Sequence, residues 1–407
     1  MKQQHVDIHK AITTLSCALD LVGVDEVRHG KRVAVIARTI ALHLNWPKTE
    51  CQSILYAGML HDCGVSRIHE HRQLTATLEW EGDEGHCIRG ATYLSACQPL
   101  AHLSTEIRYH HTRWEKLLEI PIDHQLRLRA NLLYLADRID ILQAPFLNSD
   151  QILIEYPAII ARILSLSEVL FAPELVNAFV EIADTEAFWL AMESEYLDED
   201  LRHIGLGIPT TLLTTAALKE LARLFSRVVD AKSPYTDEHS QRVAQIARQL
   251  AADFGITGHQ LDEVEIAGLL HDIGKLRVSE DIIDKPGSLT QDERAAMHRH
   301  SYDTFRILQR VFDDSKIPLW AGFHHETLLG DGYPFKNSNK ELDLECRIIA
   351  VADIFQALAQ ERPYRHTMSL EYILNDLQAR VASGHLDVNV VAKLTDNAER
   401  YYQLAVA

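Results

Sequence analysis

Residues 267–274 read Ala-Gly-Leu-Leu-His-Asp-Ile-Gly, and residues 57–64 read Ala-Gly-Met-Leu-His-Asp-Cys-Gly. The two stretches lie 210 positions apart, and the same offset relates His29 to His239. The other histidine and aspartate landmarks recur in the same order at offsets of 214 and 216: His86 with His300, His110 and His111 with His324 and His325, and Asp137 with Asp353. Seven polar positions repeated at a nearly constant offset indicate an internal duplication.

The length of the chain agrees with two domains. A chain of 407 residues is too long for one ordinary hydrophobic core and suits two domains of about 200 residues each. We place the boundary between the two copies, near residues 205–209. The sequence therefore predicts an N-terminal domain over residues 1–206 and a C-terminal domain over residues 207–407.

The spacing of apolar residues predicts helices rather than strands. At helical spacing after His239 come four apolar residues, Val243, Ile246, Ala247 and Leu250. Thr290 and Glu293 have the spacing of a capping box, which opens a helix that carries His300. Alternating patterns typical of strands are sparse. The predicted fold class is all-α, with two tandem helical bundles.

The charge and the cysteine pattern limit the classes of function. A formal charge of −18 argues against a nucleic acid polymer as partner, because backbone binding needs clustered Lys and Arg. A small anion in a locally basic pocket remains compatible with that charge. The N-terminus shows no signal segment, and no apolar run approaches the roughly 18 residues of a membrane span. The six cysteines have no paired spacing, so we expect reduced thiols in a cytoplasmic protein with no membrane partner.

The C-terminal copy gathers five imidazoles and two carboxylates: His239, His271, Asp272, His300, His324, His325 and Asp353. Several lie on otherwise apolar helical faces, where an unpaired polar group costs about 1–3 kcal/mol. A metal would satisfy all of them at once. Seven ligands exceed the three or four of a single zinc site. We therefore expect two ions that share Asp272, with His271 on one of them.

The ligand types and their number predict the chemistry. Mixed imidazole and carboxylate ligands favour transition metals over Mg²⁺. We expect two divalent ions, with iron or manganese as first candidates and zinc, nickel or cobalt as the others. Two ions about 3.5–4 Å apart generate hydroxide at neutral pH and neutralise charge on a phosphate. No serine nucleophile motif and no glycine-rich phosphate loop in the sequence competes for this role.

The C-terminal motifs follow a recognisable order: His239, His271-Asp272-Ile-Gly-Lys275, His300, His324-His325-Glu, Gly332-Tyr333-Pro334, Asp353 and Arg362-Pro-Tyr-Arg365. This ordered set resembles the HD-GYP family within the HD phosphohydrolase superfamily. The resemblance implies a helical fold and a centre of two or three metal ions. It also implies a phosphodiesterase that hydrolyses cyclic di-GMP or the 3′,3′-cyclic GMP-AMP hybrid to a linear dinucleotide or to mononucleotides.

The resemblance also implies a role for each motif residue. One ion would be held by His239, His271, Asp272 and Asp353. The other would be held by His300, His324 and His325, with Asp272 as the bridge. Lys275 would contact the scissile phosphate and assist the leaving group, beside the catalytic Asp272. Four more residues would bind substrate: Arg362 and Arg365 on phosphate, Tyr333 at the entrance, and Lys285 in a loop that matches the family's.

Three positions depart from the family's pattern. Leu329 replaces an Asp before Gly330, and Gln356 replaces an Asp three residues past Asp353. Tyr235 stands where members with three metals have a Glu. The last departure favours a two-metal site, and the first two bear on the preferred substrate.

The N-terminal copy keeps counterparts of all seven ligands, namely His29, His61, Asp62, His86, His110, His111 and Asp137. Val65 stands at the position of Lys275, and neither a Gly-Tyr-Pro nor an Arg-Pro-Tyr-Arg motif follows. We interpret this copy as a metal-retaining regulatory domain that binds a ligand, mediates a homodimer or contacts a signalling protein. Two alternatives stay open: a scaffold with unused ligands, and a second hydrolase of different specificity.

Two other functions compete with hydrolysis of a cyclic dinucleotide. One is another reaction of HD domains, on nucleotides or alarmones, which the Gly-Tyr-Pro turn and the paired arginines argue against. The other is a catalytically weak sensor that binds a cyclic dinucleotide and signals through a partner protein, which Leu329 and Gln356 leave open. The motifs do not separate cyclic di-GMP from the hybrid, because hydrogen bonds that no motif reveals would read the bases.

Overall fold

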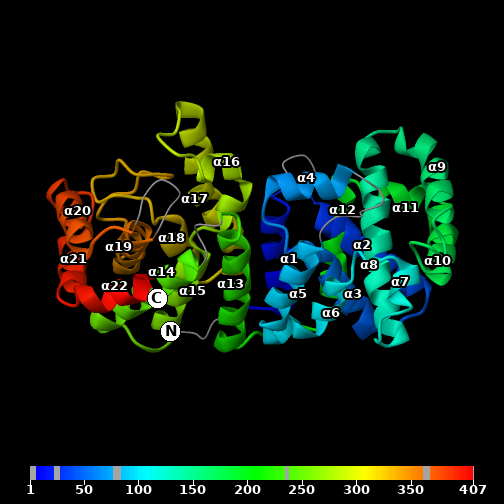
Figure 1. Cartoon of the computed structure of the whole chain (residues 1–407), viewed down its shortest axis with the longest axis horizontal. Coiled ribbons are helices and arrows are strands. Elements are labelled where there is room, and N and C mark those ends of the chain that lie inside the picture. Colours follow the sequence, from blue (N-terminus) through cyan, green and yellow to red (C-terminus); the bar gives the residue numbers. More distant parts are fainter. Residues whose placement is uncertain (1–5, 23–27, 77–83, 234–237, 361–366, 407) are drawn as a thin grey trace. The chain divides into compact units, whose positions relative to one another are not determined.

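The computed structural model of the chain describes residues 6–22, 28–76, 84–233, 238–360 and 367–406 (Figure 1). In these ranges the regular elements are helices, and the β contacts are isolated bridges such as that of Leu329 with Ser338. The predicted all-α class is therefore confirmed. No helix in the described part of the chain is long and apolar enough to cross a bilayer.

The chain divides into two compact units, each of which is a helical bundle that carries one copy of the repeat. One unit is Asp7–Thr211, and the other is Leu212–Ala407 together with the segment that ends at Val6. In the second unit the backbone N–H of Leu213 donates to the carbonyl of Val6 at 2.9 Å.

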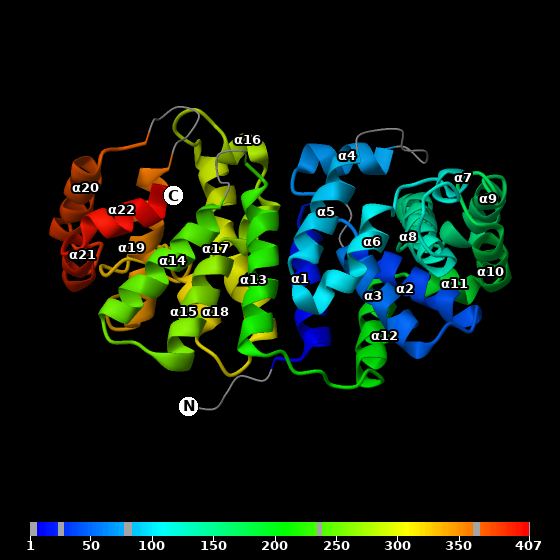
Figure 2. The same ribbon diagram turned by 60° about the horizontal axis from the view of Figure 1, so that its bottom comes forward.

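The N-terminal unit is organised around α2, α3 and α8, which pack against one another (Figure 2). Its helices are α1 (Ile8–Leu19), α2 (His29–His43), α3 (Lys48–Leu60), α4 (Ile68–Ala76), α5 (Gly85–Ser95), α6 (Ser104–Arg108), α7 (Trp114–Leu117), α8 (His124–Gln143), α9 (Ile152–Leu164), α10 (Pro173–Ala183), α11 (Glu186–Leu190) and α12 (Ser194–Leu206), with the 3₁₀ helices η1 (Gln98–Leu103) and η2 (Ala144–Phe146). Asp123 caps the start of α8, because its carboxylate accepts from Leu126 N at 2.9 Å.

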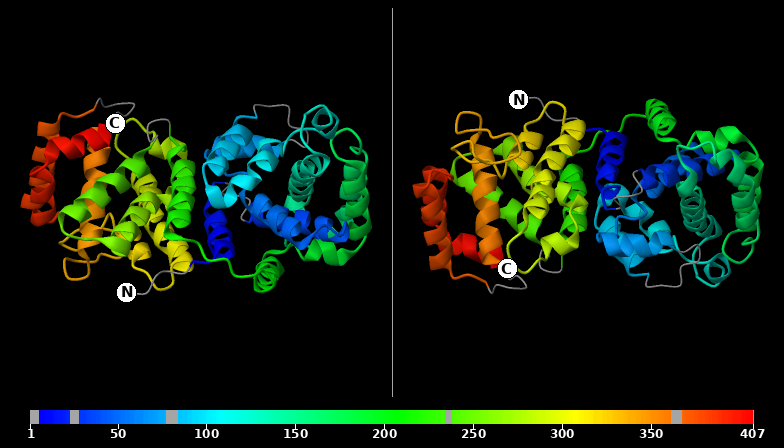
Figure 3. Two further views of the ribbon diagram at one scale, coloured as in Figure 1. Left: turned by 90° about the horizontal axis from the view of Figure 1, so that it is seen from below. Right: turned by 90° about the horizontal axis from the view of Figure 1, so that it is seen from above.

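The C-terminal unit is organised around α14, which packs against α15 and α19. Its elements are α13 (Thr215–Asp230), α14 (His239–Asp253), α15 (Gly258–Leu270), η3 (Ile273–Arg277), α16 (Glu280–Ile283), α17 (Gln291–Val311), α18 (Ile317–Gly322), α19 (Leu344–Ala359), α20 (Leu370–Ala382), α21 (Val388–Thr395) and α22 (Ala398–Val406). Helices α20 to α22 contact α19 (Figure 3). The apolar residues predicted to face inward after His239 are buried in α14. The predicted capping box of Thr290 and Glu293 opens α17.

Glycines of the repeated motif bring the helices close together. A Cβ on Gly268 would lie 2.8 Å from Ala244 Cα, so α15 approaches α14 this closely only through a glycine. A Cβ on Gly274 would overlap the carbonyl oxygen of His300, which allows the turn after α15 to lie against α17. The N-terminal unit repeats both contacts, of Gly58 with Ala34 and of Gly64 with His86. The motif thus sets the approach of the helices that carry the histidines.

Candidate active site

The structure brings together the seven ligands predicted in the C-terminal unit. They lie at helix ends and on inner helix faces: His239 opens α14, His271 and Asp272 follow α15, His300 lies in α17, His324 and His325 follow α18, and Asp353 lies in α19. Their ligand atoms form three overlapping sets, in each of which all atoms lie within 4.8 Å of one another: His239, His271 and Asp353; His271, Asp272 and His324; His300, His324 and His325. This arrangement has room for more than one ion.

Asp272 turns its two oxygens toward different imidazoles. Oδ2 lies 3.3 Å from His271 Nε2 and 3.6 Å from His239 Nε2. Oδ1 lies 3.4 Å from His300 Nε2 and 3.7 Å from His324 Nε2. A carboxylate between two groups of nitrogen ligands has the position of a bridge between two cations.

Three of the imidazoles are held by the backbone of their own helix. The Nδ1 atoms of His271, His300 and His324 donate to carbonyl oxygens three residues earlier, at 2.7, 2.6 and 2.6 Å. A carbonyl oxygen only accepts, so Nδ1 carries the proton and Nε2 keeps its lone pair. Hydrogen bonds of this kind fix the tautomer and the ring orientation of metal-binding histidines.

Several ligand atoms of the cluster lack any other partner. His239 Nε2, His271 Nε2 and Asp272 Oδ1 are buried and make no hydrogen bond to a described residue. Each buried unsatisfied atom costs about 1–3 kcal/mol. Divalent cations bound by these atoms would remove that cost, so the donor set fits a metal centre.

The protonation states of the cluster also suit a metal. Burial lowers the pKa of His300 to about 3 and the pKa of His324 to about 4, which keeps both imidazoles neutral. Burial alone would raise the pKa of Asp272, but His271 and Lys275 hold it well below its usual range. Neutral imidazoles and an ionised carboxylate are the forms that bind cations.

His239 differs from the other imidazoles. Its Nδ1 is hydrogen-bonded to Gln356 Oε1 instead of to the backbone. Burial alone would lower the pKa of His239, but the charge contacts of its Nε2 with Asp272 at 3.6 Å and with Asp353 at 3.3 Å raise it to about 9. Coordination through Nε2 therefore requires the loss of a proton at neutral pH.

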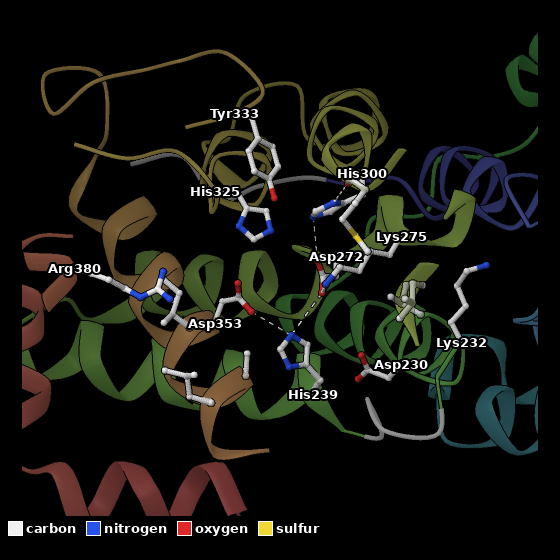
Figure 4. A pocket seen from close by; sticks show the side chains of 16 residues that line it. Asp230, Lys232, His239, Asp272, Lys275, His300, His325, Tyr333, Asp353 and Arg380 are labelled. Atoms are coloured by element: carbon white, nitrogen blue, oxygen red, sulfur yellow. Dashed lines mark hydrogen bonds and ion pairs between the residues drawn. The ribbon is translucent and has the colours of Figure 1, made fainter. Parts of the chain in front are cut away.

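A cavity of about 360 Å³ opens beside the cluster (Figure 4), and five of the seven ligands line it. Lys275 and Arg380 lie on opposite sides of the ligands in this view. Lys275 Nζ is bonded to Asp272 Oδ2. The ring of Tyr333 lies 4.8 Å from that of His325, centroid to centroid, at the edge of the cavity. The Gly-Tyr-Pro segment therefore borders the metal ligands.

Models of the HD domain match the chain twice, over residues 27–142 and over residues 223–390. The chain is 37% identical over 411 residues to the 3′3′-cGAMP-specific phosphodiesterase 1 of Vibrio cholerae, and the match covers 99% of this chain and 94% of the relative. This chain belongs to the HD-GYP family of cyclic dinucleotide phosphodiesterases. The predicted family, the tandem architecture and the assignment as an enzyme are thereby confirmed.

Other HD-GYP relatives match over shorter segments. The 3′3′-cGAMP-specific phosphodiesterase 3 of V. cholerae is 37% identical over 213 residues, which are 52% of this chain and 46% of the relative. A cyclic di-GMP phosphodiesterase of Thermotoga maritima is 32% identical over 165 residues, which are 40% of this chain and 45% of the relative. Over nearly the whole chain, the fold matches the crystal structure of the cyclic GMP-AMP-specific phosphodiesterase V-cGAP3 of V. cholerae with a TM-score of 0.66 at 24% identity, and the match covers 97% of this chain and 98% of that one. That structure shows the same fold.

The predicted substrate-binding residues of the HD-GYP domain have different positions. Tyr333 lines the cavity. Lys285 does not line it, because its Nζ pairs with Glu293 Oε1 at 2.8 Å at the start of α17. Arg362 and Arg365 lie outside the described residues, as does Tyr235. A role in substrate binding stays a prediction for Lys285 and for both arginines.

Three charged residues of the cavity were not indicated by the HD-GYP motifs: Asp230, Lys232 and Arg380. Lys232 is buried, and its Nζ donates to the carbonyl of Leu276 at 2.9 Å. The sequence offered one sign of Asp230 and Lys232: both charged residues follow directly after the apolar residues Val228 and Val229. Arg380 comes from α20, far from every motif, so only the packing of α20 reveals it.

The N-terminal HD domain assembles its counterparts into two sets: His29, His61 and Asp137, and Asp62, His86, His110 and His111. Here too, Nδ1 of His61 and Nδ1 of His110 donate to carbonyl oxygens three residues earlier, at 2.8 and 2.7 Å. The cavity beside this cluster measures about 20 Å³, and Val65 lines it where the HD-GYP domain has Lys275. In the described part of this domain the candidate metal ligands thus lie beside a cavity much smaller than that of the HD-GYP domain.

Proposed function

We propose that the C-terminal HD-GYP domain hydrolyses a phosphodiester bond of a cyclic dinucleotide at a two-metal centre, with a linear dinucleotide as the first product. The observation that carries the proposal is the position of Asp272, whose two oxygens face two different groups of imidazoles. Two adjacent divalent ions suit phosphodiester chemistry. The relative that matches over nearly its whole length is named for 3′3′-cGAMP. We therefore rank the GMP-AMP hybrid as the preferred substrate and cyclic di-GMP as the next candidate.

The donor set fits two transition-metal ions. One would be held by His239, His271 and Asp353, the other by His300, His324 and His325, and Asp272 would contact both. When bound, the ions supply a hydroxide nucleophile at neutral pH and neutralise charge on the phosphate. Imidazole-rich sites favour iron or manganese over magnesium.

We assign to Lys275 the role of donating a proton to the leaving group. Its Nζ contacts Asp272 Oδ2, and its side chain lines the cavity. An ammonium at this position holds a proton within reach of the oxygen that departs when the phosphodiester bond breaks. Its positive charge also opposes the negative charge that develops on the phosphate.

The cavity accommodates the part of the substrate that does not react. Its volume of about 360 Å³ falls within the roughly 300–1,000 Å³ that is usual for small-molecule sites. Ile283, Met297 and Ile354 supply apolar walls for the bases. A cyclic dinucleotide carries two phosphates, and Arg380 supplies a guanidinium on the side of the ligands opposite to Lys275. Arg380 would bind the phosphate that is not cleaved.

The N-terminal HD domain has a regulatory role in this proposal and hydrolyses nothing. Its cavity of about 20 Å³ supports this division of labour, because the described residues that line that cavity include Val65 but no lysine or arginine.

Hydrolysis and simple binding are distinguished by one experiment. The full-length protein is freed of metal, loaded with Mn²⁺ or Fe²⁺, and offered cyclic GMP-AMP, cyclic di-GMP and cyclic di-AMP separately. A linear product from one of them would support the proposal. Tight binding without product would overturn it in favour of a sensor. Asp272→Ala should abolish turnover, whereas Asp62→Ala, the matched change in the N-terminal domain, should leave most of it. An equal loss in both variants would overturn the division of labour.

A further inference from the structure

The N-terminal cluster differs from the catalytic one by a buried thiol. Cys87 Sγ lies 3.3 Å from His86 Nε2, and Cys87 is 1% exposed. The corresponding atom in the HD-GYP domain is Ser301 Oγ, which lies 3.3 Å from His300 Nε2. The two domains therefore share the geometry at this position but differ in the ligand chemistry, because a thiolate binds transition metals far better than a hydroxyl does.

Four buried polar atoms of the residues beside Cys87 lack a hydrogen bond. Asp62 Oδ1, His86 Nδ1, His110 Nε2 and His111 Nδ1 are buried without a hydrogen bond to any residue that the structure describes. These four residues also form one set in which the ligand atoms lie within 4.8 Å of one another. Burying four polar atoms without hydrogen bonds is costly unless a cation occupies the set.

The neighbouring set of the same domain, His29, His61 and Asp137, is already paired with a positively charged side chain. Arg138 donates to Asp137 Oδ2 from Nη2 at 2.6 Å and from Nε at 3.1 Å, and both side chains are buried. The counterpart of Arg138 in the HD-GYP domain is Ile354, which carries no charge. A guanidinium on Asp137 repels a dication at His29 and His61. The N-terminal domain is therefore built for one ion, whereas the HD-GYP domain has ligands for two.

We propose that the N-terminal HD domain binds one divalent transition-metal ion through Asp62, His86, His110 and His111, and that Cys87 joins them as a thiolate. The thiol gives its proton to solvent when the ion binds. Five protein ligands would leave no open position for a water, which would distinguish this site from a catalytic one. A set that combines nitrogen, oxygen and sulfur ligands suits a transition-metal ion, and Co²⁺ reports thiolate coordination spectroscopically.

Cobalt tests this site separately from the catalytic centre. Full-length protein with Asp272→Ala, which removes the bridging ligand of the HD-GYP domain, is stripped of metal and titrated with Co²⁺. We expect one tightly bound ion per chain and a thiolate-to-cobalt charge-transfer band in the near ultraviolet. Adding Cys87→Ser should remove the band and weaken Co²⁺ binding by more than about tenfold, since loss of even an outer partner of a metal ligand costs that much.

Cys63→Ser is the matched control, because Cys63 is buried in the same domain but directs its Sγ to Gly90 O at 3.8 Å. This variant should keep the band, and far-ultraviolet circular dichroism should show that all variants are folded. The proposal is overturned if the Asp272→Ala protein takes up no Co²⁺, if the ion binds without the band, or if the band survives Cys87→Ser.

Discussion

Gln356 Oε1 is hydrogen-bonded to His239 Nδ1 in the HD-GYP domain. The corresponding pair of the N-terminal domain is His29 Nδ1 with Asp140 Oδ2, at 2.7 Å. An amide thus orients the first imidazole of the proposed catalytic centre, whereas a carboxylate orients its counterpart. A carboxylate partner raises the basicity of a metal-binding imidazole more than a neutral amide does.

Gln356 is predicted to support metal binding through this hydrogen bond. Gln356→Ala should weaken Mn²⁺ binding to the HD-GYP domain about 10–100-fold, because His239 loses its orienting partner. Gln356→Asp should bind at least as tightly as the unmodified protein, since Asp140 shows that an aspartate fits this role. Competition with a chelating dye measures both affinities. Equal affinities in the three proteins would show that Gln356 does not orient the ligand.

Lys275 is predicted to act in the chemical step. Lys275→Ala should lower kcat by about 100-fold or more, because a positive charge next to the reacting phosphate is lost. Metal content, measured by elemental analysis, should stay unchanged. Lys316→Ala is the comparison: its Nζ donates to Asp343 Oδ2 at 2.9 Å and does not line the cavity, so its kcat should stay close to that of the unmodified protein. A comparable loss of kcat in both variants would contradict a specific role of Lys275.

Arg380 is predicted to hold substrate without taking part in the reaction. Arg380→Ala should raise KM about 10–100-fold and leave kcat nearly unchanged, because a hydrogen bond to a charged group contributes about 1.5–3 kcal/mol. Arg306→Ala, at an exposed position of α17, should change neither constant. Steady-state kinetics with the GMP-AMP hybrid measure both. A fall in kcat with KM unchanged would contradict the assignment.

The sequence predicted those residues of the site whose type and spacing recur together in both copies of the repeat. The seven ligands could be predicted because the gaps of 32 residues from His239 to His271 and of 24 residues from His300 to His324 recur in the other copy. The helical class followed from apolar spacing and one capping box. Within the motif, Gly268 and Gly274 could have been explained in advance only by knowing which helices meet there.

The rest of the site depends on tertiary packing. Arg380 reaches the cavity because α20 contacts α19, and no local pattern reports that contact. The small N-terminal cavity is lined by Leu19 at the end of α1, by Val22 just after that helix and by His71 of α4, which the packing of these segments brings together. Arg138 follows Asp137 directly in the sequence, yet its ion pair with that carboxylate is visible only in the folded structure.

Lys232 is predicted to make stability depend on pH. Burial lowers its pKa to about 8 from the ordinary value of 10.5. Between these pH values the unfolded chain binds more protons than the folded chain, so this group makes the free energy of unfolding rise with pH. Below pH 8 its destabilising effect is fully present. The Lys232→Met variant lacks this effect. Between pH 8 and pH 10 its free energy of unfolding should therefore increase less, or decrease more, than that of the unmodified protein. Urea unfolding at several pH values measures the difference, and parallel profiles for the two proteins would contradict it.

Metal removal is predicted to destabilise the protein, because both units bury candidate ligand atoms that make no hydrogen bond to a described residue, such as His110 Nε2 and His271 Nε2. An ion that binds only the folded chain, at a free concentration of 100 times Kd, should raise the free energy of unfolding by about 2.7 kcal/mol per site. Scanning calorimetry of stripped and reloaded protein should show this as a higher Tm. Asp272→Ala should lose the part of the shift that belongs to the HD-GYP domain. Asp62→Ala combined with Asp272→Ala should lose all of it, because each carboxylate lies at the centre of its own cluster. A shift that persists in the double variant would mean that the stabilising ions bind elsewhere.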